Sequence, residues 1–96
     1  MAVDFDQLLD ELADMHVYLD VDLSDFPTLA QYSSMPSARN LVLEATDAVA
    51  RAQSRADPLL ERRALQAVAI ARQAVKKASG VVNLIRIRDK LRDKLG

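Results

Sequence analysis

The side chains with the clearest chemical potential are a lone histidine and a run of aspartates near the N-terminus. Asp6, Asp10 and Asp14 lie four residues apart, which places their carboxylates on one face of a helix. Neighbouring carboxylates can bind a divalent cation or share a proton, and His16 could act as a base close to Asp14. The segment has neither the loop glycine of a calcium site nor a Glu-x-x-His pair, so a solvated acidic face is the simpler interpretation.

Other kinds of reactive site find no support in the sequence. There is no cysteine, which excludes a thiol nucleophile, a disulfide and a Cys-ligated zinc, and one histidine is too few for an ordinary zinc site. No glycine-rich phosphate loop is present, and Ser33, Ser34 and Ser37 have no base close by in the sequence. We therefore predict that the protein is not an enzyme, that it has no catalytic, cofactor-binding or metal site, and that His16 is partly buried on an apolar helical stripe.

Length and composition predict one soluble helical domain. The 96 residues are half hydrophobic, but most of the apolar side chains are Ala, Leu and Val, and there are only two glycines. Ala and Leu favour helices, whereas chains rich in β-structure need more glycine in their turns. No apolar run approaches the roughly 20 residues of a membrane-spanning helix, and the N-terminus lacks the basic start of a signal peptide. We expect a cytoplasmic protein without a transmembrane segment.

The elements that position these side chains can be read from periodicity and capping residues. Residues 1–20 are predicted to form an acidic helix capped by Asp4, and residues 21–36 a connector that contains a short helix starting at Pro27. In the acidic helix the apolar residues recur at helical spacing. They are Phe5, Leu8, Leu9, Leu12, Met15, His16 and Leu19.

Two Ala-rich helices are predicted at the centre of the fold, over residues 37–56 and 58–79. Asp57 followed by Pro58 is a strong start signal for the second of them, and so short a link makes the two helices antiparallel neighbours. Their apolar stripes are Ala38, Leu41, Val42, Ala45, Ala48, Val49, Ala52 and Ala56 on one helix, and Leu60, Ala64, Ala67, Val68, Ala71, Val75 and Ala78 on the other. The predicted fold is an all-α bundle of three to four helices around this antiparallel hairpin.

Residues 81–95 are predicted to form a basic amphipathic helix, with Ser79 and Gly80 ending the helix before it. One long helix bent at Gly80 is an alternative, because glycine inside a helix costs only about 1 kcal/mol. A second alternative concerns residues 17–23 and 84–88, where apolar and charged residues alternate. Such alternation is also typical of a two-stranded ribbon packed against helices.

Charge is divided very unevenly along the chain. Residues 1–36 contain eight acidic and no basic side chains, whereas residues 37–96 contain thirteen Lys and Arg against six Asp and Glu. The two parts therefore carry −8 and +7, which sum to the net charge of −1. Such asymmetry either orients the helices against one another or provides charged faces for a partner, where complementary potentials raise association rates.

We predict from these features a non-enzymatic helical module for protein–protein interaction, such as an adaptor, a small regulatory subunit or a self-assembling protein. The expected partner-binding residues are Arg86, Arg88, Lys90, Arg92, Lys94, Asp6, Asp10 and Asp14. The alternative function is nucleic-acid binding through the basic C-terminal half. Nucleic acid is the less expected partner, because Asp89 and Asp93 interrupt the basic run and no aromatic residue is interleaved for base stacking.

Overall fold

The computed structural model describes residues 3–32 and 34–96, without the side chains of residues 29, 31 and 32. These residues form three long helices and one short one, which are α1 (Phe5–Tyr18), α2 (Pro27–Tyr32), α3 (Met35–Arg55) and α4 (Pro58–Leu95). The prediction of an all-helical fold is confirmed. No strand occurs within the described ranges, so the two-stranded ribbon over residues 17–23 and 84–88 is wrong.

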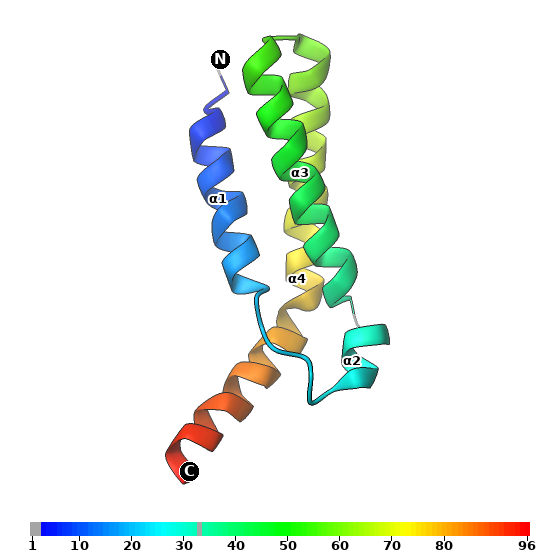
Figure 1. The fold of residues 1–96 in the computed structure, drawn as a ribbon. Coiled ribbons are helices and arrows are strands. Elements are labelled where there is room, and N and C mark those ends of the chain that lie inside the picture. The colour runs from blue at the N-terminus through cyan, green and yellow to red at the C-terminus, as the bar shows by residue number, and fades with distance from the viewer. Residues whose placement is uncertain (1–2, 33) are drawn as a thin grey trace.

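The body of the molecule is built on α3 and α4, which run side by side in opposite directions (Figure 1). Their short link consists of Ala56, which adopts the left-handed conformation at φ 52°, and Asp57. As predicted, Asp57 caps α4 by accepting a hydrogen bond from the backbone N–H of Leu59 at 2.8 Å, and Pro58 occupies the first helical position. These local signals end one helix and start the next within two residues.

Alanines at seven-residue spacing on α3 and α4 belong to the buried core. All of them are completely buried, and they are Ala38, Ala45 and Ala52 on α3 and Ala64, Ala71 and Ala78 on α4. Larger residues, among them Val42, Val49 and Val68, fill the space beside them. Because a methyl group is the smallest apolar side chain, such stripes allow two helix backbones to approach closely.

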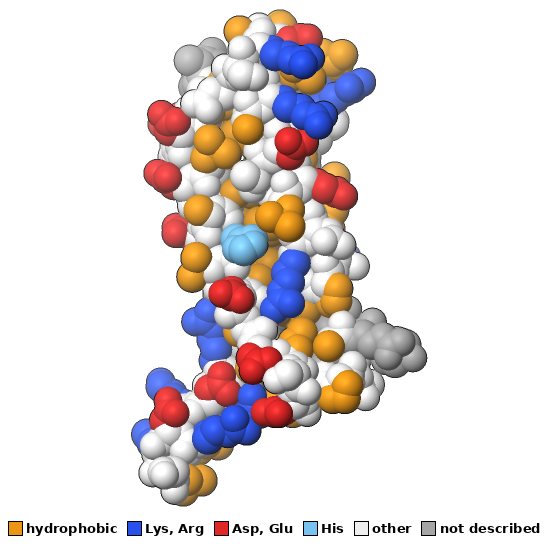
Figure 2. Space-filling model, in the orientation of Figure 1, with side chains coloured by type: hydrophobic (Ala, Val, Ile, Leu, Met, Phe, Trp, Pro, Cys, Tyr) orange, Lys and Arg blue, Asp and Glu red, His pale blue; other side chains and the backbone are white. Residues whose placement is uncertain are grey.

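The acidic helix α1 packs mainly against α3 and has a smaller contact with α4. It begins as predicted, because Asp4 accepts a hydrogen bond from the backbone N–H of Gln7 at 3.0 Å. Leu12 and Leu19 are completely buried and belong to the same core as the alanine stripes, whereas Phe5, Leu8, Leu9 and Met15 are partly buried. The prediction for His16 is wrong: its side chain is exposed, as Figure 2 shows near the middle of this face.

The predicted boundary at Ser79 and Gly80 is absent, since α4 continues without interruption to Leu95. The alternative of one long helix is the structure observed, and the helix changes direction near Gly80 (Figure 1). With 38 residues against 21 in α3, α4 extends well past its neighbour. We call residues 80–95 the α4 extension. At about 1.5 Å per residue it is roughly 24 Å long.

The connector lies two residues earlier than predicted, because α1 ends at Tyr18 and α3 begins at Met35 and includes Pro36 in its first turn. Pro36 fits there because the first turn of a helix has no hydrogen bond for a proline to lose. The remaining linker between α1 and α3 packs on the α4 extension. Leu19 and Leu23 from the linker side and Val82 and Ile85 from α4 are buried in one continuous core.

Candidate functional site

The first part of the site is the contact between the acidic N-terminal third and the basic helix α4. Glu11 on α1 receives two hydrogen bonds from Arg72 on α4, of 2.6 Å from Nε and 2.7 Å from Nη2. This geometry is the bidentate arrangement for which the guanidinium group is well suited. The pair therefore joins α1 to the centre of α4.

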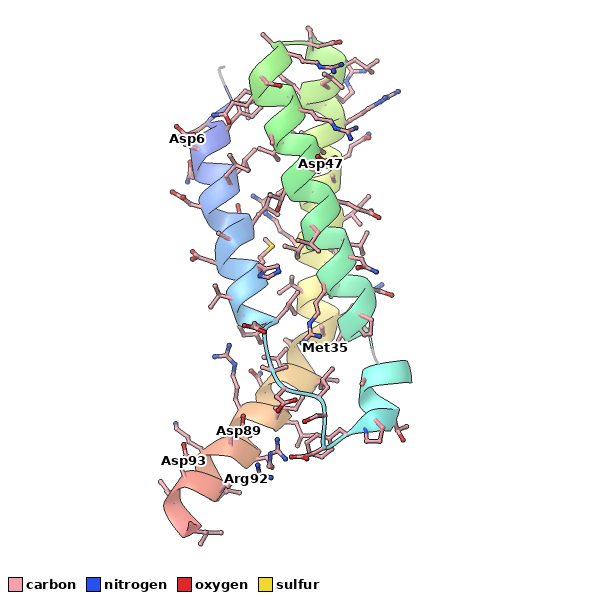
Figure 3. All side chains as sticks on the ribbon, in the orientation of Figure 1. Asp6, Met35, Asp47, Asp89, Arg92 and Asp93 are labelled. Atoms are coloured by element: carbon pink, nitrogen blue, oxygen red, sulfur yellow. The ribbon has the colours of Figure 1, made fainter. Side chains whose placement is uncertain are left out.

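A second group of contacts lies where the linker crosses the α4 extension. Asp25 accepts hydrogen bonds from Arg88 at 2.9 Å and from Arg92 at 3.3 Å, and Arg92 is labelled on the extension in Figure 3. The Arg88 guanidinium also lies 4.8 Å from the ring centre of Phe26, within the range of a cation–π interaction. Asp89, on the same helix, accepts a further bond from Arg88 at 3.0 Å. Arg88 therefore contacts two carboxylates and one aromatic ring of its own chain.

Arginines also bind the carbonyl oxygens at the end of α1. Arg39 on α3 donates to the carbonyl oxygen of Leu19 through Nε and Nη2, at 3.1 and 2.9 Å, and to that of Val21 at 2.8 Å. Arg86 donates to the Tyr18 carbonyl oxygen at 3.1 Å and lies 5.0 Å from the centre of the Tyr18 ring. A cation at a helix C-terminus is favourable because the last carbonyl groups have no partner within the helix.

These contacts change the titration of the carboxylates. The hydrogen bonds from Arg72 lower the pKa of Glu11 below its ordinary value, although partial burial opposes the shift. The bonds from Arg88 and Arg92 lower the pKa of Asp25 in the same way. The pKa of Asp22 is also lowered, mainly because its carboxylate accepts a hydrogen bond from the backbone N–H of Ser24 at 2.9 Å.

We predict from these shifts that acid weakens the attachment of α1 and the linker. A carboxylate whose pKa is lower in the folded state stabilises the fold above its unfolded-state pKa, and this stabilisation is lost as the pH falls. The unfolding free energy should decline once the pH drops below the ordinary values of 4.5 for Glu11 and 3.8 for Asp25, until the lowered values are passed. Urea unfolding at a series of pH values measures this decline.

The matched variants for this experiment remove different carboxylates. Glu11→Gln combined with Asp25→Asn should flatten the dependence on pH, because the three ion pairs of these carboxylates are lost. Asp10→Asn combined with Asp14→Asn is the control, since neither aspartate forms an ion pair with any described residue. An equal flattening in both double variants would show that the ion pairs of Glu11 and Asp25 do not cause the dependence of stability on pH.

The residues predicted to bind a partner fall into two groups. Arg86, Arg88 and Arg92 face the linker and are used within the chain, as is Asp6, which accepts a hydrogen bond from Gln53 at 3.0 Å. The other four are exposed and form no ion pair among the described residues; they are Lys90, Lys94, Asp10 and Asp14. The structure therefore brings the basic run and the N-terminal third together, with Arg39, Arg72, Glu11 and Asp25 as partners outside the predicted set.

The predicted separation of charge is consequently only partial on the folded surface. Acidic side chains line the edge formed by α1, but red and blue side chains alternate around the inner side of the α4 extension (Figure 2). That alternation is where Asp25 meets Arg88 and Arg92. Exposed cations that form no ion pair with a described residue occur instead along the opposite side of α4.

That opposite side is a continuous exposed stripe, which we call the outer seam. Its members alternate at intervals of four and three residues, and every one of them is exposed. They are Leu59, Arg63, Gln66, Ile70, Gln73, Lys77, Gly80, Leu84, Ile87, Leu91 and Lys94. Leu84, Ile87 and Leu91 are 58%, 56% and 54% exposed, whereas Val82 and Ile85 on the other side of the helix are buried.

The outer seam contains no acidic residue along the whole of α4. The three acidic residues of the helix lie off the seam, at Glu61, Asp89 and Asp93. Four further cations flank the seam, and these are Arg62, Lys76, Arg88 and Lys90. Of the seven Lys and Arg in or beside the seam, Arg88 alone forms an ion pair with a described residue. All four lysines of the chain belong to this set.

The surface is also hollowed in three places. An open groove of about 420 Å³ between α3 and α4 is lined mainly by apolar residues, including Leu41, Ile70 and Ala74, and reaches the outer seam at Lys77. A second, of about 500 Å³, adjoins Ile87 and Lys90 on the extension, and a third, of about 340 Å³, lies beside His16.

Within the described ranges, no group of three or more His, Cys, Asp or Glu is arranged to hold a metal ion. The described helices include none with a stretch apolar and long enough to span a bilayer. Comparison with known proteins finds no matching family model, curated protein or solved structure.

Proposed function

We propose that this protein is a non-enzymatic helical module that docks a partner protein through the outer seam of α4. The observation that carries the proposal is the composition of this exposed stripe, which contains five large apolar and three basic side chains and no acidic one. A solvent-facing helix side ordinarily carries charged and polar residues instead of a row of large apolar ones. Leu84, Ile87 and Leu91 leave apolar surface in water that a docked partner would remove.

The rest of the fold suits a supporting role in this function. We propose that α3 and α4 act as an Ala-lined antiparallel hairpin within a small bundle, with α1 joined to it through Leu12 and the pair Glu11–Arg72. The linker contacts then hold the α4 extension in place from its inner side. An adaptor or a small regulatory subunit needs such a rigid element that presents one face.

Nucleic-acid binding is the alternative, and the unpaired cations of α4 favour it. Against it stand the apolar members of the seam, because phosphate contacts leave Ile70, Leu84, Ile87 and Leu91 without a partner. No Phe, Tyr or Trp lies in the seam to stack on a base. The two functions can therefore be distinguished by whether a protein or a nucleic acid contacts Ile87.

The test is site-specific photo-cross-linking in the organism that makes the protein. A photoreactive amino acid at position 87 should yield a discrete adduct that protease destroys and nuclease does not. The same group at position 65 is the control, because Leu65 is also exposed on α4 but lies off the seam. A nuclease-sensitive adduct at position 87, or equal adducts at both positions, would contradict a protein-docking seam.

A further inference from the structure

We infer that the partner's docking element is an acidic amphipathic helix, which packs along residues 80–94 of α4 in the manner of a coiled coil. This inference rests on the proposed function and adds the chemistry of the partner. Three features of the seam carry it, namely its spacing, its glycine and its charge.

The spacing of the exposed apolar residues matches the requirement for pairing with another helix. Leu84, Ile87 and Leu91 are separated by three and four residues, which is the spacing of the two contact positions in a heptad repeat. A stripe of only two positions per heptad is the narrow seam of a coiled coil, whereas a helix lying in a membrane surface has a wider apolar face. The three side chains span about 10 Å along the helix axis, or two turns.

Gly80 continues the same stripe one turn upstream and has no role within this chain that requires glycine. Its φ is not positive, and a Cβ atom added at this position would meet nothing within 4 Å. A glycine here therefore weakens the helix without relieving any contact in the free protein. On the outer seam, by contrast, a missing side chain allows the backbone of a second helix to approach closely.

Charge selects an acidic partner in preference to a second copy of this chain. Lys90 stands directly beside the seam, and Lys77 and Lys94 lie at its two ends. If two copies paired seam to seam, both helices would bring cations and no acidic residue to the contact positions, and such like charges oppose pairing. A helix with glutamate or aspartate beside its apolar positions would satisfy the same lysines.

The acidic helix α1 of a second copy would not fit the outer seam as the partner's helix. The exposed side of α1 carries Asp10 and Asp14, but Val17 is its only exposed large apolar residue among those described. The apolar residues of α1 are turned toward α3 and α4 instead. Docking of α1 from another copy would thus offer charge without the apolar contacts that the seam needs.

The test uses a synthetic three-heptad peptide with Leu at its contact positions and Glu at the flanking positions. Its own pairing is opposed by the glutamates, so it is available as a monomeric probe. Fluorescence anisotropy should show binding to the full chain at least about tenfold tighter than that of the same peptide with Lys at the flanks. Polyglutamate should bind far more weakly, because it supplies the charge but not the apolar contacts.

Variants of this chain locate the binding. Ile87→Ser combined with Leu91→Ser should weaken binding of the Glu-flanked peptide about tenfold or more, whereas the control Leu65→Ser should not. Gly80→Leu should also weaken binding, while Gly80→Ala should leave the helical circular dichroism intact and the affinity largely unchanged. Unfolding curves for every variant establish that the fold is preserved.

Several results would overturn the inference. Equal affinity for polyglutamate, for the Lys-flanked peptide or for a DNA duplex of similar length would show that the seam does not select an acidic helix. If position 87 forms protein adducts but the Glu-flanked peptide does not bind, the partner's chemistry is wrong and the docking function stands. If neither occurs, both are wrong.

Discussion

Replacing Leu12 with alanine should lower the free energy of unfolding by about 2–5 kcal/mol, the range for deleting a large buried aliphatic side chain. Leu12 is the one residue of α1 that is completely buried within the helix, and it joins α1 to the core formed by α3 and α4. Its loss leaves a cavity between the helices that their backbones cannot easily close. Chemical denaturation followed by circular dichroism measures the change.

Leu95→Ala is the control for this variant. Leu95 is 86% exposed at the end of α4, so its truncation should change the unfolding free energy by less than about 0.5 kcal/mol. A small effect of Leu12→Ala, comparable to that of the control, would mean that α1 is not packed on the core as the structure shows.

The second large effect is expected from enlarging an alanine of the α3–α4 contact. Ala71→Leu should destabilise the protein by about 1–3 kcal/mol, because the added atoms have no space where the two helices meet. Ala50→Leu, at an exposed position of α3, introduces the same change in helix propensity without a change in packing. The difference between the two variants in urea unfolding isolates the packing contribution.

A neutral or stabilising Ala71→Leu would contradict close approach of the two helices along the alanine stripes. The buried alanines of α3 have the same seven-residue spacing, and Ala45 is the central one of them. Enlarging Ala45 in the same way should therefore have an effect of similar size.

The helices themselves could be predicted because their signals are local. Asp4 and the pair Asp57–Pro58 start helices where capping chemistry requires, and the alanine and valine stripes identify the buried sides of α3 and α4. The end predicted at Gly80 failed because a glycine costs only about 1 kcal/mol within a helix. Burial of Val82 and Ile85 in the continuous core outweighs that cost.

The candidate site could be predicted only in part. The sequence indicated that charge was important, but charged residues that are close in sequence point in different directions and contact different parts of the structure. Arg88 and Lys90 are two positions apart, which on a helix places them about 200° apart around the axis. Arg88 therefore meets Asp25 and Phe26, while Lys90 stands beside the outer seam. Arg39 and Arg72 lie outside the basic run, and no local pattern marks their partners.

The cations of α4 differ in residue type according to where they lie on the helix. Those that contact the N-terminal third are all arginines, namely Arg72, Arg86, Arg88 and Arg92. Arginine suits these contacts because its planar group can bind two acceptors and stack on a ring at the same time. The lysines, whose single charged group is strongly hydrated, all remain on the outer side.

The most direct test of this division compares two double variants that remove the same charge from the same end of α4. The affinity for the Glu-flanked peptide is measured for Lys90→Gln with Lys94→Gln and for Arg88→Gln with Arg92→Gln. We predict that the lysine pair weakens binding at least about fivefold, and that the arginine pair changes it by less than about twofold while lowering stability. Equal losses of affinity, or a larger loss for the arginine pair, would contradict an outer seam that is reserved for a partner.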